Sequence, residues 1–122
     1  ISKNLKSIVS ISSISSRNGN KGISLYSSSK ASLNNLAKSF ALELSQRKIR
    51  INTINLGHIN IGMGEEYKSK FGDKMFNQLE RMHPLGFGKP QDLNNLVKFL
   101  INNQKSRWIT GTNITLDGGY SI

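Results

Sequence analysis

The sequence predicts an α/β fold in which parallel strands alternate with helices. A short run rich in Ile and Val, residues 5–13, leads directly into the Ser- and Gly-rich residues 15–22. A long helical pattern over residues 26–47 follows, and a second strand-like run over 49–57 stops at Gly57. A strand, a long helix and a second strand form one βαβ unit, for which a right-handed crossover and a parallel strand pair are expected.

The helix expected at 26–47 carries an apolar face broad enough to pack on a sheet. The residues of this face recur three or four positions apart and are Ala31, Leu33, Leu36, Ala37, Phe40, Ala41 and Leu44. After a loop at 58–65, residues 66–82 predict an imperfect amphipathic helix with Gly72 inside it.

The end of the chain predicts one more helix and one more strand. Pro90 opens the helix over 90–104. The residues that share its apolar face are Leu93, Leu96, Val97, Leu100 and Ile101. Residues 109–119 predict the last strand, beside which Trp108 is expected to pack. The expected order is strand, helix, strand, helix, helix, strand in a single partial domain over 1–122.

Composition excludes several classes of protein. The chain has no Cys, which excludes disulfides and thiolate zinc sites, and its two histidines, His58 and His83, are far apart in sequence, so no metal centre is expected. The net charge is +10, but Lys is scattered beside Asn and Ile without interleaved aromatics, so nucleic acid is not an expected partner. No signal-peptide pattern or membrane-spanning apolar run is present, which favours a cytoplasmic location away from membranes.

Three residues form a candidate reactive group. Ser13 ends the first predicted strand, and ligands of open α/β sheets bind beyond that end. Tyr26 and Lys30 are four residues apart at the start of the following helix, so their side chains lie on one face. A phenol exchanges its proton near neutrality only when a neighbouring cation favours the phenolate, and Lys30 is positioned to supply that charge.

The surrounding motifs resemble the classical short-chain dehydrogenase/reductase family. They are SIVSISSISS, a serine thirteen residues before the YxxxK pair, YSSSKASL, IRINTINLG, HPLGFGKPQDL and ITGTNITLDGG, in the family's order. The resemblance covers the whole chain and is greatest to the 3-oxoacyl-[acyl-carrier-protein] reductase branch. It implies the C-terminal half of a Rossmann-like, doubly wound parallel sheet. This half is incomplete on its N-terminal side, because the family's glycine-rich cofactor loop is absent.

The resemblance also implies a reaction and a cofactor. Ser13, Tyr26 and Lys30 match the family's catalytic residues, which transfer hydride between NADP or NAD and a carbonyl or alcohol substrate. Tyr26 and Lys30, with the loop residues Gly57 and Ile59, would meet the cofactor. The missing half would choose between NADP and NAD.

The substrate is expected to be a small carbonyl or alcohol compound, with a 3-oxoacyl thioester as the leading choice and a sugar or another small ketone next. Ser15 and His58 would line the substrate crevice together with Ser13 and Tyr26, although an exposed loop histidine explains His58 equally well. An acyl carrier protein is a further expected partner. Arg47 lies where such reductases dock the carrier, but a solvated Arg at a helix end is the simpler interpretation.

Three positions depart from the family pattern. Leu56 replaces a proline, Ile61 replaces a threonine that contacts the cofactor, and HPLGFGKP is one residue short and lacks an arginine. Loss of the threonine hydroxyl would weaken cofactor binding by roughly 1 kcal/mol, the scale of one hydrogen bond. These departures cast doubt on cofactor affinity rather than on the fold.

Two hypotheses for the whole protein follow. The first is an active reductase that forms a homo-oligomer, a tetramer or dimer, through the helix at 26–47 and the C-terminal strand. The alternative is a non-catalytic remnant, or a subunit that assembles with a partner and cannot bind a dinucleotide alone. In this chain taken alone, the first strand near residues 8–11 would lack its inner neighbour and form an open sheet edge.

Overall fold

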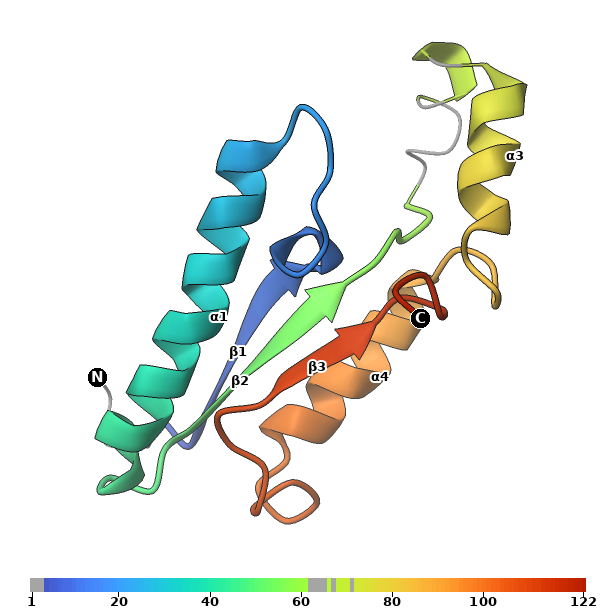
Figure 1. Ribbon diagram of the computed structural model, residues 1–122. Helices are drawn as coiled ribbons and strands as arrows, with labels where there is room; N and C mark the ends of the chain where they lie inside the picture. The colour runs from blue at the N-terminus through green and yellow to red at the C-terminus, as the bar shows by residue number, and fades with distance from the viewer. Residues whose placement is uncertain (1–3, 62–65, 67, 71) are drawn as a thin grey trace.

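The computed structural model describes residues 4–61, 66, 68–70 and 72–122 and contains one parallel sheet with strand order β1-β2-β3. Figure 1 shows α1 and α4 packed along this sheet, with α3 set apart beyond the strand ends. The elements in chain order are β1 (Ser7–Ser13), the 3-10 helix η1 (Ile14–Ser16), α1 (Ser24–Ser45), β2 (Arg50–Leu56), α3 (Asp73–Arg81), α4 (Pro90–Ile101) and β3 (Asn113–Leu116). The predicted α/β class and element order are confirmed.

The register of the sheet aligns the carboxyl ends of the strands. Ser7 pairs with Arg50 and Ser13 with Leu56, so β1 and β2 end side by side, and β3 joins β2 in the same direction. The side chains of alternate residues in β2 point to opposite faces of the sheet. Arg50 donates to the main-chain oxygen of Leu100 in α4, at 2.9 Å, whereas Ile51 packs under α1. The two helices therefore cover opposite faces of the sheet.

The face of α1 that meets the sheet is narrower than predicted. The buried residues are Asn34, Ala37 and Ala41, and the two alanines form a core cluster with Ile51. Leu36 and Phe40, expected on this face, are 48% and 39% exposed. Small alanine side chains let the helix backbone approach β2 closely, so larger residues at the margin of the stripe are turned outward.

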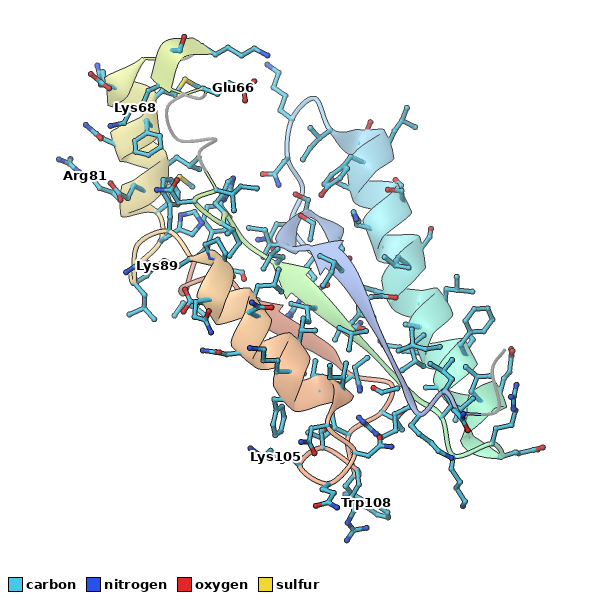
Figure 2. The ribbon with its side chains drawn as sticks, turned by 180° about the vertical axis from the view of Figure 1, so that it is seen from behind. Glu66, Lys68, Arg81, Lys89, Lys105 and Trp108 are labelled. Atoms are coloured by element: carbon cyan, nitrogen blue, oxygen red, sulfur yellow. The ribbon has the colours of Figure 1, made fainter. Side chains whose placement is uncertain are left out.

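Two further expectations were wrong. The helix predicted over 66–82 is interrupted, because Gly72 adopts a φ of 81° and α3 begins only at Asp73. Residues 62–65, 67 and 71, which the prediction also covered, lie outside the described part of the chain. Trp108 does not pack beside β3. Its side chain is 89% exposed and points away from the loop after α4 in Figure 2. The guanidinium of Arg107 lies over its ring.

The apolar face of α4 is confirmed only in part. Leu100 is completely buried, but Ile101 is 52% exposed at the last position of the helix. The helix starts as expected at Pro90, where the Asp92 carboxylate accepts a hydrogen bond from the Lys89 amide at 2.7 Å. This contact satisfies one of the free N–H groups at the helix start.

The ends of β2 and β3 approach each other at Gly57. The Gly57 amide donates to the Leu116 carbonyl at 2.9 Å. A Cβ atom added to Gly57 would lie 2.7 Å from both Cα and Cβ of Asp117, a separation that real Cβ atoms do not reach. A residue without a side chain is therefore required here.

We expect Gly57→Ala to lower the free energy of unfolding by about 1–3 kcal/mol, the usual cost of forcing an extra methyl group into a packed site. The measurement is urea unfolding of the full-length protein. Gly19→Ala is the matched control, because a Cβ at Gly19 would meet nothing within 4 Å. Equal stability of the two variants would contradict the close approach.

Candidate active site

Ser13 lies at the turn where β1 passes into η1. Its side chain is 8% exposed, and its Oγ accepts a hydrogen bond from the Ser15 amide at 3.1 Å. This bond caps η1 and fixes the Ser13 rotamer. A hydroxyl that accepts one hydrogen bond can still donate its own hydrogen to a ligand. Ser15, which is also predicted to line the crevice, thus orients the Ser13 side chain through its main-chain amide.

Tyr26 and Lys30 occupy the first turns of α1. The Lys30 ammonium lies 5.6 Å from the centre of the Tyr26 ring and donates to the Ile11 carbonyl of β1 at 3.0 Å. The Ser12 hydroxyl in turn donates to the Lys30 carbonyl at 3.1 Å. Tyr26 is 47% exposed. These bonds hold the start of α1 against the end of β1, although no hydrogen bond joins the described hydroxyls of Ser13 and Tyr26.

A cluster of buried amides and hydroxyls supports the serine turn. Asn34 of α1 donates to Ser16 Oγ at 2.8 Å and to the side-chain oxygen of Asn55 in β2 at 2.9 Å. Ser16 Oγ donates to the Ser13 carbonyl at 2.6 Å. These residues were not among the predicted site residues. The sequence feature that could have found them is an asparagine on the core-facing side of a helix, Asn34, together with one in a buried strand, Asn55.

The loop after β2 carries Gly57 and Ile59. Ile59 forms an isolated parallel bridge with Gly88, in which the Gly88 amide donates to the His58 carbonyl at 2.9 Å and the Asn60 amide donates to the Gly88 carbonyl at 2.8 Å. In such a bridge the N–H and C=O of the central residue point the other way. Among the described residues, those two groups of Ile59 make no main-chain hydrogen bond.

His58 and His83 meet in space despite their separation in sequence. His58 Nδ1 lies 3.1 Å from His83 Nε2, and His83 Nδ1 lies 2.8 Å from the Leu79 carbonyl oxygen. His83 is 3% exposed, whereas His58 is exposed on its outer side. Burial, and then the neighbouring His83, lower the pKa of His58. Although they are 25 residues apart in the sequence, the two histidines are therefore close partners in the fold.

No group of three or more His, Cys, Asp or Glu residues able to hold a metal ion occurs in the part of the chain that the structure describes. Within the same ranges, no helix has the length and apolar character needed to cross a bilayer.

Comparison with known proteins identifies the family. The family model described as Enoyl-(Acyl carrier protein) reductase matches residues 1–121. The chain belongs to the short-chain dehydrogenase/reductase family. The curated relatives of this short-chain dehydrogenase/reductase include carbonyl reductase family member 4 of Xenopus laevis, 38% identical over 95% of the chain and 45% of the relative. They also include the 3-oxoacyl-[acyl-carrier-protein] reductase of Thermotoga maritima, 36% identical over 95% of the chain and 46% of the relative.

Solved structures agree with this membership. A 4-hydroxyisoleucine dehydrogenase mutant complexed with NADH and succinate is 33% identical, with a TM-score of 0.84 over 98% of this chain and 48% of that one. A short chain dehydrogenase family protein from Francisella tularensis is 32% identical, with a TM-score of 0.83 over 94% of this chain and 50% of that one. The chain spans about half the length of these relatives, so it is the partial Rossmann-like sheet that the sequence predicts. These relatives are named as oxidoreductases, and two of the solved dehydrogenases are complexed with NADH.

The amide cluster predicts a specific loss of stability. We expect Asn34→Ala to lower the free energy of unfolding by about 1 kcal/mol, since it removes two buried hydrogen bonds but also removes the unpaired buried Oδ1 of Asn34. Urea unfolding of the full-length protein measures this. Asn35→Ala, at the neighbouring exposed position of α1, should stay within about 0.5 kcal/mol. A larger effect at Asn35 than at Asn34 would refute the role of the cluster.

Proposed function

We propose that the full-length protein is an NAD(P)-dependent oxidoreductase that interconverts a carbonyl and an alcohol with Ser13, Tyr26 and Lys30 as its catalytic residues. The observation that carries this proposal is the position of Lys30. Its ammonium group lies beside the Tyr26 ring and is hydrogen-bonded to β1 two residues before Ser13. A fixed cation beside a phenol is the arrangement that proton transfer from tyrosine requires.

The residues present fit a nicotinamide cofactor. Lys30 has three N–H donors, and its bond to the Ile11 carbonyl leaves two for ribose hydroxyls. The N–H and C=O of Ile59, turned away from Gly88, match the acceptor and donor of a carboxamide. Gly57 keeps this stretch of main chain close to the end of β3. When bound, the nicotinamide supplies or accepts the hydride.

The three catalytic side chains have distinct roles. In the reductive direction Tyr26 donates its phenolic proton to the oxygen that becomes negative as hydride reaches the carbonyl carbon. The Ser13 hydroxyl donates a hydrogen bond to the same oxygen, and its bond from the Ser15 amide orients it beforehand. Lys30 stabilises the phenolate that remains on Tyr26. In the oxidative direction the phenolate takes the proton from the alcohol.

The substrate we propose is a 3-oxoacyl thioester, carried by an acyl carrier protein, and the crevice residues are Ser13, Ser15, Tyr26 and His58. The support is that the relatives from Thermotoga maritima and from Rickettsia species are 3-oxoacyl-[acyl-carrier-protein] reductases. Carbonyl reductases at similar identity make a simple ketone the next choice. In vivo we propose a cytoplasmic location.

Turnover tests the assignment of Tyr26. We expect Tyr26→Phe to lower kcat by about 10²–10⁴-fold, the usual contribution of a general acid, while the thermal unfolding midpoint is retained. The measurement is NAD(P)H oxidation by the full-length protein with 3-oxoacyl thioesters and simple ketones. Lys30→Ala should also abolish most turnover, whereas Lys38→Ala, an exposed lysine further along α1, serves as the control. Full activity of Tyr26→Phe would refute the mechanism.

Assembly is the other testable part of the proposal. We propose that the full-length protein is a homo-oligomer that pairs through α1 and the C-terminal strand. The outward side chains of α1 support this, since Leu25 and Leu42 are 87% and 77% exposed. Sedimentation velocity should give a dimer or tetramer, and Leu42→Glu should shift it toward a monomer. A monomeric wild-type protein would contradict the proposal.

A further inference from the structure

The two histidines have a defined arrangement of protons. The Leu79 carbonyl can only accept a hydrogen bond, so His83 Nδ1, 2.8 Å away, carries a hydrogen. In neutral His83 the other nitrogen, Nε2, is then an acceptor. His58 Nδ1, 3.1 Å from it, must be the donor. Both neutral rings therefore carry their hydrogen on Nδ1, and the lone pair of His58 is on Nε2.

The pair lies where three loops converge. The His58 carbonyl accepts from the Gly88 amide at 2.9 Å, and the His83 carbonyl accepts from the Gly86 amide at 2.8 Å. The Leu85 amide donates to the Gly118 carbonyl after β3 at 3.0 Å. The His58–His83 bond is a side-chain connection between the loop after β2 and the turn that follows α3. A change in this bond therefore acts on the main chain around Gly57 and Ile59.

Aromatic rings enclose the pair. The His83 ring lies 5.1 Å from Phe87 and 4.7 Å from Tyr120, and Phe76 of α3 packs on Phe87 at 5.2 Å. His83 has no room to turn away while these contacts persist, because it is 3% exposed. His58 is the more exposed member, and besides its bond to His83 its ring lies 6.0 Å from Phe87 and 5.9 Å from Tyr120.

We propose that His83 is a positioning residue that fixes the His58 ring and the loop Gly57–Asn60, and that acid releases this loop by protonating both rings. The inference rests on the proposed function, since this loop would contact the nicotinamide. One added proton, on His58 Nε2, preserves the bond between the rings. A second places hydrogens on both facing nitrogens, and the 3.1 Å contact then becomes repulsive.

The charged and polar groups that face the histidine pair come from the end of β3 and the C-terminal turn. From the end of β3 the Asp117 carboxylate interacts electrostatically with His83, and Tyr120 faces both rings from the C-terminal turn. Burial raises the pKa of Asp117, but hydrogen bonds from the Ser121 hydroxyl and the amides of Gly119 and Ser121 outweigh it, and the pKa is lowered overall. Asp117 thus stays ionised in mild acid, and its negative charge acts on the buried pair.

The direction of the pH effect follows from His58. Because burial and His83 lower its pKa in the folded protein, the unfolded chain binds protons more readily. Stabilisation by this group is complete above its ordinary pKa of about 6.5 and is lost as the pH falls below that value. The ordered loop is therefore expected at neutral pH and its release in acid.

Cofactor affinity and histidine NMR test the proposal in the full-length protein. The probe is NADH or NADPH, whichever binds, titrated by fluorescence between pH 8 and pH 5. We expect the wild-type Kd to rise roughly fivefold across this range, the scale of one hydrogen bond. His83→Phe should show the weaker binding at every pH. His83→Gln should bind tightly at every pH, because its carbonyl oxygen accepts from His58 without being protonated.

The ratio of variant to wild-type Kd at each pH removes any effect that ionisation of the cofactor itself has on the Kd. Long-range ¹H–¹⁵N spectra at pH 8 should find the Nδ1–H form of both histidines. Parallel pH curves for wild type and His83→Phe, or an Nε2–H form of His83, would overturn the proposal. Failure to bind either dinucleotide at any pH would instead refute the proposed function. The spectra would still show which ring nitrogen of each histidine carries the hydrogen.

Discussion

The parallel pairing of β1 with β2 determines where every candidate functional group lies. Ser13 is opposite Leu56, so both strands end at one edge of the sheet. Because the strands are parallel, the chain must return from their carboxyl ends to their amino ends before β2 can begin, and α1 makes that return. The first turn of α1 is consequently at the same edge as the last residue of β1. Ser13 from the strand and Tyr26 from the helix therefore lie at the same end of the sheet because of strand direction.

The contact between α1 and the sheet combines two kinds of packing. At the middle of the helix Ala37 and Ala41 bring the backbone close to Ile51. Nearer the site, the contact becomes polar, with Asn34 bonded to both Ser16 and Asn55. An apolar contact tolerates sliding, whereas hydrogen bonds fix distance and direction. The polar part is next to the turn that presents Ser13, where a fixed geometry is useful.

The other side of the site is built by loops that approach one another closely. Gly57 permits the end of β2 to pass against Asp117, and Gly88 bonds to the main chain on both sides of Ile59. The His58–His83 contact adds a titratable connection to this otherwise main-chain framework. The two sides differ physically, since fixed amides and hydroxyls support the serine turn and ionisable rings support the loop after β2.

The sequence by itself determined the fold class and the order of elements, and it singled out Ser13, Tyr26 and Lys30 as candidate reactive residues. Periodicity and glycine or serine punctuation are local signals, and Ser13, Tyr26 and Lys30 are near one another along the chain. Only the tertiary structure decided which helical residues are buried. Leu36 and Ala37 are both apolar, but Ala37 packs against Ile51 whereas Leu36 is half exposed. It also decided the partners of Asn34 and His58. Those contacts join residues 21 and 25 positions apart, and a hydrogen bond between distant residues leaves no spacing pattern in the sequence.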